Sequence, residues 1–210
     1  MTSLVRTLNR SALIDGIIVQ LPLPNHIWKE AVLATIDPNK DVDGLHPNNL
    51  GRLMSDDTDV QSFTPCTPLG VIALLQHYGI KIRGKHCVVV GRSALVGKPL
   101  SQLLLGAGGT VTVCHSGTKE LSTHTLQADI LISATGVPNL ITADMVKPDA
   151  VVVDVGITRG DDGKLHGDVD FEAVSQIASF ITPVPGGVGP MTRAALMSNV
   201  FEAWCRNAAD

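Results

Sequence analysis

From about residue 63 onward, short apolar runs alternate with longer stretches of helical periodicity. The apolar runs predict buried strands at 87–90, 110–114, 129–133, 150–155 and 180–184. Helices are expected at 68–78, 96–106, 119–127, 142–146 and 170–177. Continuously apolar strands joined through helices are typical of a parallel sheet that is covered on both faces. The pattern therefore predicts an α/β fold with a doubly wound, Rossmann-like sheet.

The first 62 residues follow a different pattern. Residues 15–21 read as a buried strand, closed by the turn Pro22-Leu23-Pro24, and residues 4–8 as the end of a short amphipathic helix. A second helix is expected at 26–36, followed by a loop rich in Asp, Asn and Gly at 39–59.

Two domains are expected from this change of pattern. A nucleotide-binding domain would cover residues 63–189, with an exposed turn at 159–166. A smaller domain would cover residues 1–62 and be completed by the last helix, within 190–210.

Composition narrows the functional class. Hydrophobic residues make up 44%, charged residues 17% and aromatic residues 3%, which suits a well-buried α/β protein with an aliphatic core. A formal charge of -4 gives no reason to expect nucleic-acid binding. No apolar stretch is long enough to cross a membrane, and Met1–Arg6 has no signal-peptide core, so a cytoplasmic protein is expected.

Cysteine and histidine spacing argues against disulfides and metals. The cysteines form no C-x-x-C pair and are expected to be reduced thiols; they are Cys66, Cys87, Cys114 and Cys205. Metal-ligand spacing is also absent among the histidines His46, His115 and His166, so no metal site is expected.

A glycine-rich turn follows the first strand of the nucleotide-binding pattern. It runs from Gly91 through Arg92 and Ser93 to Gly97, and such a turn lets a pyrophosphate approach the backbone at a helix N-terminus. Ser93 replaces the second glycine of the usual G-x-G-x-x-G pattern. Taken alone, the motif could also form a simple turn before a packed helix, although the β-α units around it disfavour that alternative.

The end of the second strand bears on the choice of coenzyme. NAD-binding proteins usually carry an Asp or Glu there for the ribose 2′-hydroxyl. Here no acidic residue occurs before Glu120, whereas Ser116 and Arg92 would suit a 2′-phosphate. NADP is therefore the favoured coenzyme, although these polar residues could also form a solvated loop.

Six blocks together resemble the bifunctional methylenetetrahydrofolate dehydrogenase/methenyltetrahydrofolate cyclohydrolase family. They occur in the family's order and span essentially the whole chain: Asp15–Pro24, Pro38–Asn49, Thr64–Pro68, the glycine turn with His115-Ser116 behind it, Gly167–Phe171 and Thr182–Thr192. The resemblance implies a NADP-binding Rossmann domain and the remainder of a smaller α/β folate-binding catalytic domain. It also implies tetrahydrofolate substrates in one-carbon metabolism, which supplies purine biosynthesis, and a homodimer formed through the nucleotide domain.

The resemblance assigns roles to individual residues. Gln20 would face the cleft and orient a catalytic lysine, and Asp43 would pair with the pterin ring; both count as catalytic and substrate-binding candidates. Without the resemblance, Gln20 could be a buried polar residue satisfied by turn backbone, and Asp43 an ordinary turn residue beside Gly44. Asp41 is the better candidate for such a turn role.

Further contacts carry over to the second half of the chain. The loop with Pro185, Gly186 and Gly187 would wall the folate and coenzyme sites, or simply return the chain to the first domain. The coenzyme contacts would be Gly91, Arg92, Ser93, Ser116 and Ile157.

One family feature has no match. The catalytic lysine of the family lies in a Tyr-x-x-x-Lys motif, but the single tyrosine, Tyr78, is followed four positions later by Ile82. The resemblance therefore implies an N-terminally truncated member. A misassigned start or truncated gene is the favoured explanation; the alternatives are a segment supplied by another chain and a relative that retains NADP binding only.

Overall fold

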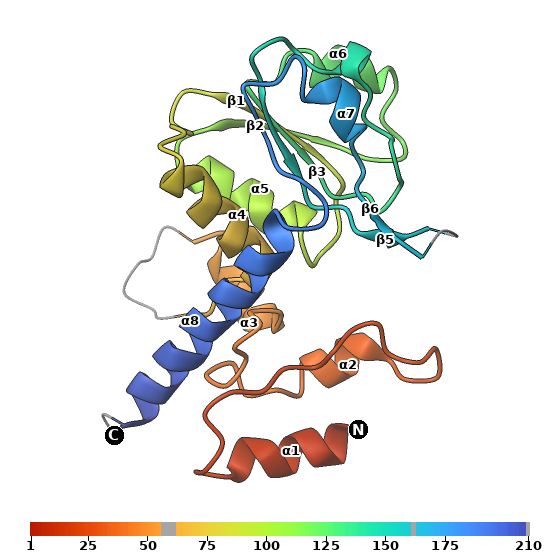
Figure 1. Cartoon of the computed structure of the whole chain (residues 1–210). Helices are drawn as coiled ribbons and strands as arrows, with labels where there is room; N and C mark the ends of the chain where they lie inside the picture. The colour runs from red at the N-terminus through yellow and green to blue at the C-terminus, as the bar shows by residue number, and fades with distance from the viewer. Residues whose placement is uncertain (56–61, 161–162, 209–210) are drawn as a thin grey trace. The chain divides into compact units, whose positions relative to one another are not determined.

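The computed structural model describes residues 1–55, 62–160 and 163–208, which form two compact units. One unit comprises Met1–Cys66 together with Arg193–Asp210, and the other comprises Thr67–Thr192. Figure 1 traces the chain through both.

The larger unit is built on a five-stranded parallel sheet with the order β2-β1-β3-β4-β7. Its strands are β1 (His86–Val90), β2 (Thr110–Cys114), β3 (Ile130–Ser133), β4 (Val151–Asp154) and β7 (Phe180–Ile181). All five predicted strands therefore form. β2 has the expected bounds, β1 is one residue longer than expected, and the other three are shorter by one to three residues at an end. The doubly wound α/β fold is confirmed.

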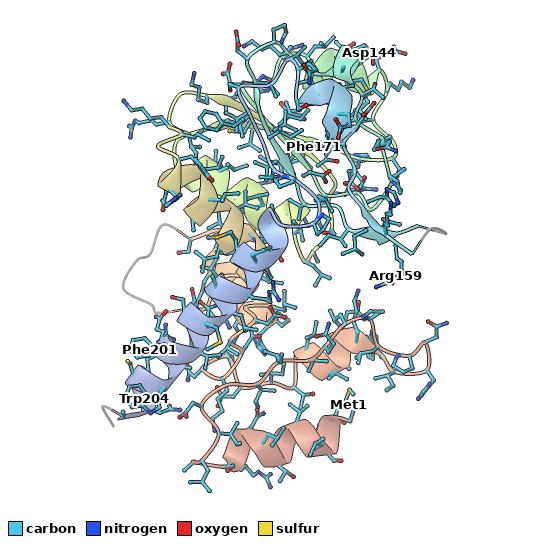
Figure 2. All side chains as sticks on the ribbon, viewed as in Figure 1. Met1, Asp144, Arg159, Phe171, Phe201 and Trp204 are labelled. Carbon is cyan, nitrogen blue, oxygen red and sulfur yellow. The ribbon has the colours of Figure 1, made fainter. Side chains whose placement is uncertain are left out.

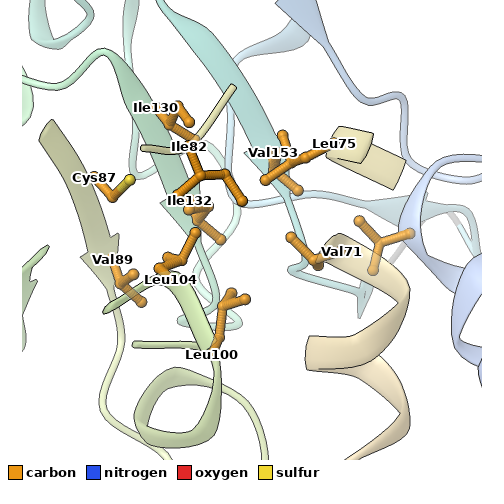
Figure 3. Close-up of a cluster of buried hydrophobic side chains, with 11 residues drawn as sticks. Val71, Leu75, Ile82, Cys87, Val89, Leu100, Leu104, Ile130, Ile132 and Val153 are labelled. Atoms are coloured by element: carbon orange, nitrogen blue, oxygen red, sulfur yellow. The ribbon is translucent and has the colours of Figure 1, made fainter. Parts of the chain in front are cut away.

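Helices cover both faces of this sheet (Figure 1). They are α4 (Cys66–His77), α5 (Gly97–Gly106), α6 (Leu121–Thr125), α7 (Phe171–Val174) and the 3₁₀ turn η1 (Ala143–Met145). Side chains of β1 alternate between two cores: Cys87 and Val89 join the one beneath α4 and α5, and Val88 and Val90 join the one beneath α6 and α7. Figure 3 shows the first core, in which Leu100 and Leu104 of α5 pack against β1 and β3.

Several helices are shorter than their periodicity predicts. The expected helix at 119–127 is limited to α6, the one at 170–177 to α7, and the one at 142–146 to the 3₁₀ turn η1. The exposed turn expected at 159–166 is an antiparallel hairpin of β5 (Thr158–Arg159) and β6 (Leu165–His166), and its residues 161–162 lie outside the described part.

The smaller unit contains α1 (Thr2–Arg10), α2 (Lys29–Leu33), α3 (Pro47–Arg52) and most of α8 (Val188–Ala208). Its core joins Val42 and Phe63 to Ala203, with Leu196 and Val200 of α8 packed against them. Phe201 and Trp204 of α8 are instead exposed, at 63% and 54%, and their rings lie 5.9 Å apart (Figure 2).

Two predictions for this unit were wrong. The segment expected to form a buried strand at 15–21 makes only a single parallel bridge among the described residues, between Ile17 and Asp41. It is also not fully buried, since Ile18 is 49% exposed. The loop expected at 39–59 contains helix α3, and its residues 56–59 lie outside the described part. The His46 ring caps α3 by accepting from the Asn48 N–H at 3.0 Å, with Pro47 at the first helical position.

Within the described residues, no helix is long and apolar enough to cross a membrane.

Candidate functional site

The carboxyl ends of four strands meet in one row at the edge of the sheet. Cys114 of β2 pairs with Val90 of β1, Val90 with Ser133 of β3, and Ser133 with Asp154 of β4. The loops that follow these residues therefore begin side by side. In open α/β sheets, ligands bind in the crevice outside this edge.

The glycine turn after β1 is packed against the loop after β3. Gly91 has a φ of +122°, and a Cβ on it would lie 2.4 Å from the Ala134 carbonyl oxygen. A Cβ on Gly97, where α5 begins, would lie 2.1 Å from the Gly91 oxygen. Only glycine fits either position, so this turn has the tightness that a dinucleotide-binding loop requires.

Ser93 holds the turn together from within. Its hydroxyl oxygen accepts from the N–H groups of Val96 (3.1 Å) and Gly97 (3.4 Å), and its carbonyl accepts from the Lys98 N–H at 3.0 Å. These first amides of α5 are thus already engaged. A phosphate at this turn must share them with Ser93 or rely on nearby side chains.

Arg92 and Ser116 are the polar side chains available nearby. Both are exposed, and they follow the neighbouring strands β1 and β2 at equivalent positions. The turn after β2 is fixed by Thr118, whose hydroxyl accepts from the His115 N–H at 2.9 Å, and by the His115 ring, which accepts from the Gly117 N–H. No acidic residue lies between Cys114 and Lys119, so the donor set suits a 2′-phosphate.

Ile157 provides an apolar surface after β4. It is 54% exposed, and a Cβ on Gly189 would lie 3.9 Å from its Cδ1 atom. Gly189, two residues after the loop with Pro185, Gly186 and Gly187, therefore lies beside Ile157. A tight glycine turn, a basic side chain, a hydroxyl and an apolar wall are together compatible with NADP.

The other unit carries Asp43. Its carboxylate is partly buried and lies near the Cys66 thiol, which donates a hydrogen bond to the Val42 carbonyl at 3.4 Å. Burial raises the pKa of Asp43, while the neighbouring Cys66 thiol opposes that rise. Gly44 makes the approach possible: its φ is +71°, and a Cβ there would lie 2.5 Å from the Pro65 nitrogen.

Cys66 and Asn199 form the surroundings of Asp43. Burial, with the Asp43 charge second, raises the pKa of the Cys66 thiol to about 12, so the thiol remains a protonated donor. The Asn199 amide donates to the carbonyls of Val42 (2.9 Å) and Thr64 (3.1 Å). Neither residue was predicted to lie near Asp43 from the sequence; a buried Asn within an otherwise apolar helix face was the available signal.

Asp41 has the turn role that was suggested for it. It is 1% exposed, and its Oδ2 atom accepts from the His46 N–H (2.7 Å) and the Asn49 amide (2.8 Å). Burial raises its pKa. Gln20 is exposed, and its amide donates to the Leu21 carbonyl at 3.1 Å. Its proposed role stays a prediction.

No group of three or more His, Cys, Asp or Glu side chains in the described part of the chain could hold a metal ion. All four cysteines are unpaired; Cys205 is exposed and the other three are buried.

Comparisons with known proteins agree with this geometry. Residues 65–208 match the NAD(P)-binding domain of tetrahydrofolate dehydrogenase/cyclohydrolase, and residues 1–43 match its catalytic domain. The bifunctional protein FolD of Hydrogenobaculum sp. (strain Y04AAS1) is 56% identical over 200 residues, which cover 95% of this chain and 71% of the relative.

The chain belongs to the tetrahydrofolate dehydrogenase/cyclohydrolase family.

Solved structures support the same assignment. The FolD enzyme of Campylobacter jejuni is 52% identical, with a TM-score of 0.93 over 96% of this chain and 71% of that one. The Trypanosoma brucei enzyme, solved with NADP cofactor and an inhibitor, is 39% identical, with a TM-score of 0.93 over 100% of this chain and 73% of that one. The predicted family and the predicted coenzyme, NADP, are therefore confirmed.

We expect the two glycines Gly44 and Gly51 to respond in opposite directions to alanine. Gly44→Ala should lower the free energy of unfolding by about 1–3 kcal/mol, because the alanine would have to adopt a left-handed backbone conformation with its Cβ too close to Pro65. Gly51→Ala is the control: it lies in α3 with nothing within 4 Å of its Cβ position, and should stabilise by about 0.5–1 kcal/mol. Urea unfolding measures both. Equal effects would contradict a specific role for Gly44.

Proposed function

We propose that this chain oxidises methylenetetrahydrofolate with NADP and hydrolyses the resulting methenyl cation to 10-formyltetrahydrofolate. One observation carries the proposal. A tight glycine turn flanked by a basic side chain and no acidic one, and a partly buried carboxylate, Asp43, beside the Cys66 thiol, occur in one chain of this family. We further propose that Met1–Cys66 with the last helix is the folate-binding domain, and that Thr67–Thr192 is the NADP-binding domain.

Bound NADP would supply the hydride acceptor. The Asp43 carboxylate would accept two N–H bonds from the aminopyrimidinone edge of the pterin. The neighbouring Cys66 thiol favours this role, because it lowers the pKa of Asp43 and so offsets part of the effect of burial, which favours the neutral acid. Gln20 would contact the same folate substrate.

On the coenzyme side, Arg92 and Ser116 would bind the 2′-phosphate, and Gly91 and Ser93 would shape the turn beneath it. The exposed Ile157 would lie against the nicotinamide and keep water from it. The neighbouring loop of Pro185–Gly187 would limit the space for folate.

A second candidate is an NADP-binding or interaction module without catalysis. Residues 1–210 contain no Tyr-x-x-x-Lys sequence, which favours this alternative. The partly buried Asp43 carboxylate favours the enzyme, since a protein that binds only the coenzyme needs no such carboxylate. A general small-substrate dehydrogenase would explain the sheet but not Asp43.

We expect a cytoplasmic protein, because its cysteines are unpaired and three of them are buried thiols. We expect neither nucleic acid nor a membrane as a partner, in line with the acidic net charge of -4.

Arg92 tests the coenzyme assignment. Arg92→Ala should weaken NADP binding by about 10- to 100-fold, because a charged hydrogen bond to the 2′-phosphate is lost, and should barely change NAD binding. Arg83→Ala, an exposed arginine before β1 at the opposite edge, is the control. Isothermal titration calorimetry measures both affinities. A loss that is equal for NADP and NAD would contradict the proposed contact.

An assay of the 210-residue chain tests the reactions. We expect NADPH formation from NADP and methylenetetrahydrofolate. Hydrolysis of the methenyl product should be slowed by about 100- to 10,000-fold relative to the Campylobacter enzyme, if the lysine of a Tyr-x-x-x-Lys motif, which residues 1–210 do not contain, is the general acid–base group. No NADPH, with NADP still raising the melting temperature, would favour the non-catalytic module. No response to NADP at all would overturn both candidates.

We also propose a homodimer formed through the NADP-binding unit. Among the described strands, β7 pairs only with β4, and the exposed rings of Phe180 and Tyr78 lie 5.9 Å apart beside it. Sedimentation equilibrium should therefore give about twice 22.1 kDa. Phe180→Lys should shift the mass toward the monomer, whereas Phe171→Lys on α7 should not. A monomeric wild-type chain would refute the proposal.

A further inference from the structure

Two buried carboxylates lie at the carboxyl edge of the sheet and have no part in the proposed reaction. Asp154 ends β4 and is 3% exposed, and Asp168 is fully buried. Asp168 belongs to the Gly167–Phe171 block, which resembles the family but received no role from the sequence.

Asp168 secures the loop after β3. Its Oδ2 atom accepts from the Ser133 hydroxyl at 2.9 Å and from the Thr135 N–H at 2.6 Å. Its Oδ1 atom is buried and has no hydrogen-bond partner. Burying an oxygen without a hydrogen-bond partner costs free energy of folding, so another contribution must offset that cost.

Asp154 secures the loop after β4 and the segment that carries Asp168. Its Oδ1 atom accepts from the N–H groups of Gly156 and Asp168, both at 3.0 Å, and its Oδ2 atom accepts from the Val169 N–H at 2.9 Å. Burial raises the pKa of Asp154, and these donated bonds oppose the rise.

The two carboxylates and two glycines pack reciprocally. A Cβ on Gly156 would lie 1.9 Å from Oδ1 of Asp168, and a Cβ on Gly167 would lie 2.0 Å from Oδ2 of Asp154. Each carboxylate thus fills the space that the other segment leaves free by using glycine. The unpaired Oδ1 atom of Asp168 therefore packs against the Gly156 backbone.

The loops tied by these carboxylates are also tied to one another. The Thr158 hydroxyl donates to the Gly136 carbonyl at 3.0 Å, and Gly91 packs against Ala134. The loops after β1, β3 and β4 therefore form one connected block. Ile157 lies within it, between Gly156 and Thr158.

We propose that Asp168 is a positioning residue for the coenzyme: through Thr135 and Gly156 it fixes the loops that hold Gly91 and Ile157 against NADP. The inference rests on the coenzyme site proposed above. Asp168 does not touch the coenzyme in this proposal; it acts through the loops.

The test compares two substitutions at Asp168 by NADP titration calorimetry and amide hydrogen exchange. Asp168→Ala removes the acceptor of Ser133 and Thr135, and should weaken NADP binding by about tenfold or more, with faster exchange at Thr135 and Gly156. Asp168→Asn keeps one oxygen for the same donors and should recover most of the affinity. Asp129→Ala, at the opposite edge, removes a carboxylate paired with Lys147 and should leave NADP affinity unchanged.

A milder variant keeps the test decisive if Asp168→Ala does not fold. Thr158→Val removes only the hydrogen bond to Gly136, and should weaken NADP binding while the melting temperature of the apoprotein changes little. If folded Asp168→Ala, or Thr158→Val in its place, binds NADP within twofold of wild type, the inference is wrong and Asp168 is merely structural. If the wild-type chain itself does not bind NADP, the proposed coenzyme site fails first.

Discussion

The central strands of the larger unit are enclosed on both faces, and this constraint decides where its chemistry can lie. Cys87 to Val90 of β1 are at most 2% exposed, and they alternate between two cores. A polar side chain within such a strand would be buried without a partner at a cost of several kcal/mol, roughly 2–7. Polar groups are therefore confined to the strand ends. The register brings four of those ends into one row, and the loops beyond them form the candidate coenzyme site.

The two units build their sites by different means. In the larger unit, glycines and loop amides set the geometry, and carboxylates such as Asp154 act on backbone N–H groups. In the smaller unit a side chain, Asp43, is presented directly, and its environment comes from other side chains: the Cys66 thiol and the Asn199 amide. Backbone cradles suit a phosphate, which needs several donors in a fixed arrangement. A carboxylate suits the fused ring of a pterin, whose adjacent N–H groups it can accept together.

Full burial also explains why the larger unit could be predicted so closely. A strand that is covered on both faces has a continuous apolar run, and the buried strands β1 and β3 were predicted to within one residue of their observed bounds. The strand predicted at 15–21 was wrong. Apolar character indicates that a segment will be buried, but not that it will pair with neighbouring strands, and Ile17 makes a single bridge there. Helix α3 was missed because its Asn and Gly content indicates a loop, whereas the His46 ring caps it.

The sequence could supply the candidate residues but not the pairings that support them. Gly91 could be inferred from a familiar turn, and its positive φ agrees. Gly156 and Gly167 are different, since neither has a positive φ, and they are glycine because a distant carboxylate occupies the space of their side chains. Asp154 and Asp168 are 14 residues apart, and no local rule links a carboxylate to a missing side chain at that distance. At Gly156 and Gly167 the glycine is therefore explained by packing, and the partner is in each case the carboxylate that ties the loops together.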